Sequence, residues 1–256
     1  MKIVSRALGI VLAVHLLNAC VTTKSGGFDP EVSVDEAVAI RVSAAKQYLK
    51  VRDFEKARRH LRLALEQAPR SPDVHDALAL SFQYSNEMAL ADKHFKQAVS
   101  LGNGESRFRN NYATFLYQLE RFKEARKQLE KVANDSLYDR RESALVLLGL
   151  TQQQLIDTQA ATRSFEQALV LNPGNALVLQ ELSIINYDAG ELSRSWSYFK
   201  QYRRAAQQSS AKMLLLGIQL ANKFDDKDSM ASFVLSLKNL YPESREYQSY
   251  LREFGA

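Results

Sequence analysis

The residue with the most distinctive chemistry is Cys20, the only cysteine in the 256-residue chain. It closes the run Leu17-Asn18-Ala19-Cys20, in which small residues precede a thiol, a pattern typical of cleavage by the lipoprotein signal peptidase. Cleavage there would leave Cys20 as the first residue, with its sulfur and its amine open to acylation. The sequence therefore predicts covalent lipid on Cys20 and no other cofactor.

The segment before Cys20 has the composition of a signal peptide. Lys2 and Arg6 flank the start of an apolar stretch over residues 7–17. That stretch is about 11 residues long, whereas a membrane-spanning helix needs roughly 20. We interpret residues 1–19 as a lipoprotein signal peptide.

Residues 20–33 are interpreted as the lipidated N-terminus and a flexible tether, because they contain Gly26-Gly27 among small polar residues. Each buried methylene contributes roughly 0.8 kcal/mol, so two or more acyl chains on Cys20 would anchor the chain stably. Val21 follows the cysteine where Asp would suggest retention in the inner membrane. We expect a lipid-anchored protein at the periplasmic face of the outer membrane.

Other residues that support catalysis or metal binding are sparse. The histidines after residue 19 are His60, His75 and His94. No second cysteine and no His-Glu-x-x-His pair accompanies them, so we predict neither an enzyme active site nor a metal site. His60 and His94 stand 34 residues apart, and we expect both to face solvent on an outer layer of helices.

Charge and composition narrow the class of protein further. The formal net charge is +5, and it falls to +3 without the cations of the leader, with acidic and basic residues interspersed. That pattern is typical of a solvated surface and does not predict nucleic-acid binding. Only five prolines and ten glycines occur, so we expect a chain that is overwhelmingly helical.

Small and bulky residues recur with a period of 34, apart from a two-residue insertion near residue 138. One small series is Ala45, Ala79, Ala113, Gly149, Ser183 and Gly217. A second small series is Ala57, Ala91, Ala125, Ala161, Ser195 and Ser229. The bulky series is Leu61, Phe95, Leu129, Phe165, Phe199 and Phe233. This spacing resembles the tetratricopeptide repeat (TPR), in which small residues let two antiparallel helices approach and a bulky residue fills the gap.

The resemblance implies an all-α fold, a right-handed TPR superhelix (α-solenoid) of six helix-turn-helix repeats with a C-terminal capping helix. The TPR domain is expected over residues 34–256. The predicted repeats are 38–71, 72–105, 106–139, 142–175, 176–209 and 210–243, and the capping helix is 243–254.

The first helix of the first repeat carries two apolar stripes. One consists of Ile40, Ala44, Tyr48 and Val51, and we expect it to face the core. The other consists of Val34, Val38, Val42 and Leu49. With no earlier repeat to cover it, we expect the second stripe to be at least partly exposed and to bind an apolar segment of a protein partner. The alternative is that residues 28–34 fold back over it.

A second candidate surface lies on the inner face of repeats four to six. Its apolar residues are Val146, Leu150, Leu177, Ile184, Leu214 and Ile218. The alternative is that a tightly wound superhelix packs these side chains against one another. We therefore rank this groove second.

A lipobox leader, a short tether and six TPRs together resemble the type IV pilus biogenesis lipoproteins of the PilF and PilW kind, the pilotins. Runs such as Ala57-Arg58-Arg59-His60-Leu61 and Tyr112-Ala113-Thr114-Phe115-Leu116 carry the match.

The resemblance implies a monomeric outer-membrane lipoprotein that binds secretin subunits. In that role it promotes their outer-membrane localisation and multimerisation for type IV pilus biogenesis and twitching motility, without any catalytic residue. Two alternatives remain open. One is a TPR lipoprotein adaptor of outer-membrane β-barrel assembly, and the other is a lipoprotein activator of a peptidoglycan synthase.

Overall fold

The computed structural model describes residues 33–255, which contain thirteen helices and no strand. Six antiparallel helix pairs are followed by a single helix. The first helices of the pairs are α2 (Val34–Lys50), α4 (Pro72–Tyr84), α6 (Ser106–Gln118), α8 (Arg141–Gln154), α10 (Ala176–Asp188) and α12 (Ala211–Lys223). The second helices are α3 (Phe54–Gln67), α5 (Met88–Leu101), α7 (Phe122–Ala133), α9 (Thr158–Leu171), α11 (Leu192–Ala205) and α13 (Lys227–Leu240). The last helix is α14 (Arg245–Phe254).

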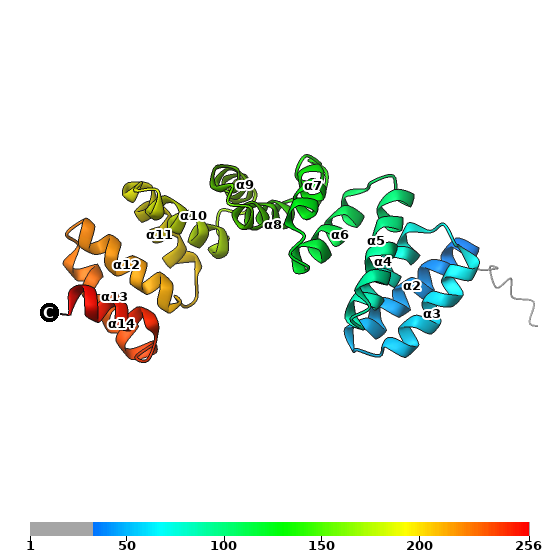
Figure 1. Ribbon diagram of the computed structural model, residues 1–256, viewed down its shortest axis with the longest axis horizontal. Helices are drawn as coiled ribbons and strands as arrows, with labels where there is room; N and C mark the ends of the chain where they lie inside the picture. Colours follow the sequence, from blue (N-terminus) through cyan, green and yellow to red (C-terminus); the bar gives the residue numbers. More distant parts are fainter. Residues whose placement is uncertain (1–32, 256) are drawn as a thin grey trace, which may run out of the picture.

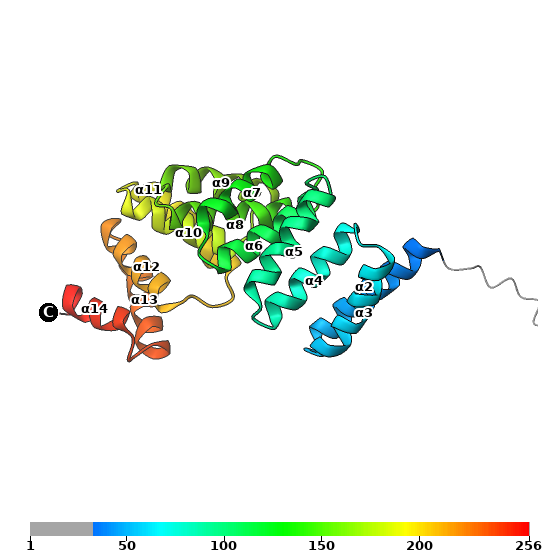
Figure 2. The same ribbon diagram turned by 45° about the vertical axis from the view of Figure 1, so that its right-hand side comes forward.

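The pairs follow one another along a curve, with α2 and α14 at opposite ends of the molecule (Figures 1 and 2). Each first helix packs against its own second helix, and the first helices from α2 to α8 also contact one another in chain order. The predicted all-α superhelix of six repeats with a capping helix is confirmed. Within residues 33–255, none of these helices combines the length and the apolar character that crossing a bilayer requires.

Close approach of the two helices in a pair depends on the predicted small residues. An added Cβ on Gly149 would lie 2.4 Å from the ring of Phe165, so nothing larger than hydrogen fits there. In the fifth pair the Ser183 hydroxyl donates to the Ser195 carbonyl (3.1 Å), and the Ser195 hydroxyl donates to the Ser183 carbonyl (2.7 Å). These bonds satisfy both buried hydroxyls and join the side chain of each serine to the backbone of the other helix.

The sixth repeat departs from the predicted register by one residue. Helix α12 begins 35 residues after α10 (211 against 176), and α13 begins 35 residues after α11 (227 against 192). Ser229 is consequently only half-buried, while Leu237 is fully buried one place beyond the expected Ser236. The extra residue lies in the connection between α11 and α12, where a loop absorbs an insertion at little cost.

Helix α14 continues the series of first helices. It begins 34 residues after α12, and Ser244 caps it through its hydroxyl as Ser210 caps α12. Tyr247, Tyr250 and Phe254 pack against the apolar cluster of α12 and α13. The capping helix therefore covers the end of the superhelix with the same face that a further repeat would use.

Candidate partner-binding surfaces

The apolar stripe predicted to be exposed on α2 is mostly core. Val38, Val42 and Leu49 are each 5% exposed and pack in one cluster with α3 and α4. Val34 is exposed, as expected. The expected exposure of the other three residues is therefore wrong.

The expectation that the other stripe, which begins at Ile40, faces the core is wrong as well. Ile40 is 57% exposed and Val51 is 72% exposed, while Ala44 and Tyr48 are only half-buried. The physical reason is that α2 meets both α3 and α4, so its buried face is the one centred on Ala45.

Two of the buried valines nevertheless form part of a groove between α2 and the start of α4. The groove has a volume of about 610 Å³. Its apolar floor includes Val38, Val42 and Ala68, and its α2 rim includes the exposed residues Ala39 and Ser43. The remaining lining residues are Asp35, Lys46, Gln47, Lys50, Ser71 and Asp73. A narrow apolar floor between polar rims is suited to a side chain or two of an apolar segment.

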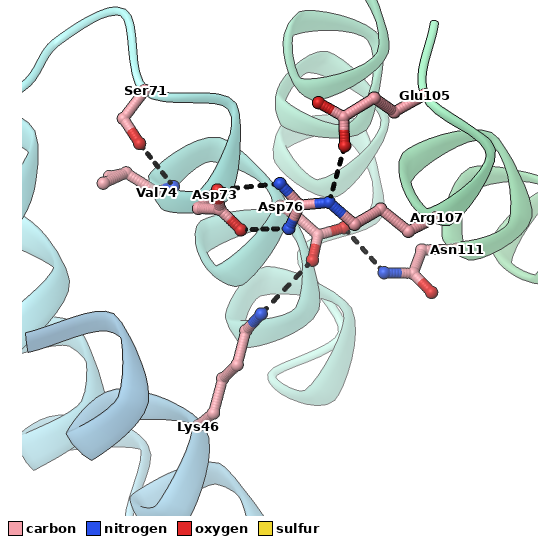
Figure 3. A network of polar contacts seen from close by, with 8 residues as sticks. All are labelled: Lys46, Ser71, Asp73, Val74, Asp76, Glu105, Arg107 and Asn111. Carbon is pink, nitrogen blue, oxygen red and sulfur yellow. Dashed lines mark hydrogen bonds and ion pairs between the residues drawn. The ribbon is translucent and has the colours of Figure 1, made fainter. Parts of the chain in front are cut away.

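Asp76 lies at the centre of a polar network beside this groove (Figure 3). It is 2% exposed, and burial raises the pKa of its carboxyl. Asn111 of α6 donates to one carboxylate oxygen at 2.9 Å, and Lys46 of α2 lies 3.7 Å from the other. One buried carboxylate thus connects the first helices of the first three repeats.

Asp73, on the groove rim, belongs to the same network. Arg107 of α6 binds both its carboxylate oxygens, with Nη2 donating at 3.0 Å, and holds the pKa of Asp73 below its usual range. The Arg107 Nε donates to Glu105 at 2.9 Å (Figure 3). Because these groups already pair with one another, they hold one wall of the groove in place.

The second-ranked surface does not form a continuous apolar groove. Leu214 and Ile218 are fully buried and Val146 nearly so, because the winding of the superhelix packs them between helices. Leu150 and Ile184 are half-buried, and Leu177 is 43% exposed. For Val146, Leu214 and Ile218 the alternative holds, in which the superhelix packs these side chains against one another.

The expectation that His60 and His94 face solvent is wrong. His60 stacks on Tyr48 with ring centroids 5.5 Å apart, and His94 stacks between His75 and Phe82. The Nε2 of His75 donates to the Pro69 carbonyl at 3.1 Å, which leaves its Nδ1 to accept from the Nδ1 of His94 at 2.9 Å.

Burial lowers the pKa of His94 to about 4. His94 therefore stays neutral under ordinary conditions, and the stacked rings contribute to packing between α4 and α5. Across residues 33–255, no group of three or more His, Cys, Asp or Glu side chains could hold a metal ion.

Comparison with known proteins gives one relative that spans nearly the whole chain. The type IV pilus assembly protein PilF of Pseudomonas aeruginosa is 37% identical over 253 residues, covering 98% of this chain and 99% of the relative. The solved structure of P. aeruginosa PilF superposes with a TM-score of 0.76, covering 86% of this chain and 99% of that one. No family model matches the chain.

Two further solved structures share the fold. PilW, described as a widely conserved type IV pilus biogenesis factor, has a TM-score of 0.67 at 24% identity, covering 84% of this chain and 99% of its own. The TPR protein YrrB has a TM-score of 0.64 at 14% identity, covering 75% of this chain and 97% of its own. At these identities the likeness concerns the fold alone.

Proposed function

The chain belongs to the PilF family of type IV pilus assembly proteins, and on that premise we propose that it is a pilotin for the pilus secretin. In this role a monomer binds secretin subunits, carries them to the outer membrane and promotes their multimerisation into the ring that the pilus crosses. The observation that carries the proposal is the α2–α4 groove, whose apolar floor lies between polar rims from α2 and from the start of α4.

The groove binds an apolar segment of the secretin subunit. Val38 and Val42 supply contact at the floor without leaving the core, and Val34 extends the apolar surface at the N-terminal end of α2. Leu49 supports the helix from inside and is absent from the groove lining. Binding of this kind needs shape and apolar contact, and no catalytic group takes part.

Membrane attachment is assigned to Cys20, which lies outside the described residues. Lipid on this cysteine places the chain at the periplasmic face of the outer membrane, with residues 20–33 as the tether. Anchoring the binder raises the local concentration of secretin subunits at the membrane where the ring must form. Assembly is then promoted by proximity.

The test targets the groove rim, since changes at the floor would disturb the core. Ala39→Arg with Ser43→Arg places two long cations over the floor from exposed positions. We expect secretin binding, measured by isothermal titration calorimetry, to weaken by roughly tenfold or more, the loss of a central contact.

The matched control is Ile40→Arg, at an exposed position of the same helix that does not line the groove. It should leave binding unchanged, and circular dichroism should show the same helix content in all three proteins. Undiminished secretin binding by the double variant would contradict the assignment of the α2–α4 groove as the binding site.

A further inference from the structure

A second groove, here called the α3–α5 groove, runs along α3 and is completed by residues of α4 and by His94 of α5. Its volume is about 820 Å³. The floor is apolar and includes Leu65, Leu78 and Phe82. This groove shares no lining residue with the α2–α4 groove, so it is a separate surface.

The α3 wall of this groove is rich in cations. It carries Lys56, Arg58, Arg59 and Arg62. The acidic side chains that share the lining, Asp53 and Glu55, stand at the N-terminal end of α3. The middle of the wall therefore presents positive charge alone.

Two of these cations remain available to a ligand. Lys56 pairs with Asp53 at 2.8 Å, and Arg58 pairs with Glu87, the N-cap residue of α5, at 2.9 Å. Among the described residues, no carboxylate forms an ion pair with the exposed side chains of Arg59 or Arg62. Two neighbouring guanidinium groups above an apolar floor match a phosphate diester joined to hydrocarbon.

Helix α11 shows why charge alone does not define this site. It carries as many cations as the α3 wall, but most of them already contact other side chains of the protein. Arg194 pairs with Glu166 at 2.7 Å, Lys200 lies over the ring of Trp196, and Arg203 donates to Ser209 at 2.7 Å. The α3 wall combines unpaired arginines with an apolar groove.

We propose that the α3–α5 groove docks on an anionic phospholipid surface, with Arg59 and Arg62 binding headgroup phosphates above the apolar floor. Helix α3 belongs to the repeat at the N-terminal end of the described chain, so this contact would orient the first repeat at the membrane (Figure 1). Each cation near an anionic surface adds a modest attraction that salt screens. The contact does not depend on secretin binding.

The test uses the full chain with Cys20→Ser, which prevents lipid attachment at that residue, and measures co-sedimentation with vesicles. Vesicles of phosphatidylcholine are compared with vesicles that also contain phosphatidylglycerol. The N-terminal segment, with its apolar residues and the cations Lys2 and Arg6, is the same in every variant, so the effect of changing Arg59 and Arg62 isolates their contribution. We expect tighter binding to anionic vesicles, and Arg59→Glu with Arg62→Glu should weaken it by about tenfold or more.

The matched control is Lys123→Glu with Lys127→Glu, which makes the same change of net charge at exposed positions of α7. It should retain most of the preference for anionic vesicles. Equal loss in both double variants would overturn the proposal in favour of diffuse attraction by net charge. Equal binding of the parent to neutral and anionic vesicles would also overturn it, and would favour an acidic protein as the ligand of this groove.

Discussion

Single side chains set how this molecule responds to acid. His94 is the clearest case, because its ring lies between His75 and Phe82 and burial lowers its pKa to about 4. In the unfolded chain the same group titrates near 6.5, so between these values the unfolded state binds more protons. The stabilisation from a neutral His94 is present above pH 6.5 and is lost as the pH falls towards 4.

The prediction is a pH-dependent difference between the parent and His94→Gln. From pH 7 to pH 5 the free energy of unfolding of the parent should fall relative to the variant by on the order of 1 kcal/mol, a value reduced for the partial exposure of the ring. Urea denaturation at the two pH values measures it, and titratable groups that do not contact His94 cancel in the comparison. A difference that stays constant with pH would contradict a lowered pKa for His94.

At the scale of helices, the close packing within each repeat follows from side-chain size at fixed positions. Gly149 on α8 meets the ring of Phe165 on α9, and the equivalent places elsewhere hold Ala or Ser, except in the displaced sixth repeat. At Gly149 the packing leaves no room for a methyl group unless the ring of Phe165 moves.

Gly149→Val should therefore destabilise the fold by about 1–3 kcal/mol through overpacking. Gly174→Val is the matched control, since an added Cβ there has only the Asn172 side chain within 4 Å, at 3.8 Å. Thermal unfolding followed by circular dichroism compares the two. Equal melting temperatures for both variants would refute the packing role of the glycine.

Several features of the helices and of their pairing were predictable from the sequence. The helix pairs and their small and bulky positions were predictable because they repeat with a fixed period. The buried face of α2 was predictable too, since Ala45, already expected to be buried, lies on one face with Val38, Val42 and Leu49. The expected core face did not include the neighbours of Ala45, and for that reason the wrong stripe was expected to be buried.

Other features depend on contacts between repeats and leave no local signal. The rims of the α2–α4 groove come from residues far apart in the chain, such as Lys46 and Asp73. The network at Asp76 likewise joins three repeats, and only the winding of the superhelix brings its members together. The one-residue shift in repeat six was hidden because Gly217 and Phe233 preserve the expected spacing.

For the molecule as a whole, the described chain is a curved stack of helix pairs with two different grooves at one end. The α2–α4 groove has an apolar floor and a rim fixed by the network of α4 and α6. The α3–α5 groove is basic, is lined by the first two repeats and shares no residue with the α2–α4 groove. On our account one surface binds the secretin, and the other faces the membrane to which lipid on Cys20 attaches the chain.

The most direct test is the amount of secretin recovered as multimers in outer-membrane fractions of cells that lack the gene and carry a plasmid copy. The parent and Ile40→Arg should restore outer-membrane multimers and twitching motility. Cys20→Ser should displace the multimers from the outer membrane, and Ala39→Arg with Ser43→Arg should leave subunits unassembled. Full outer-membrane multimers with both of these variants would contradict the account.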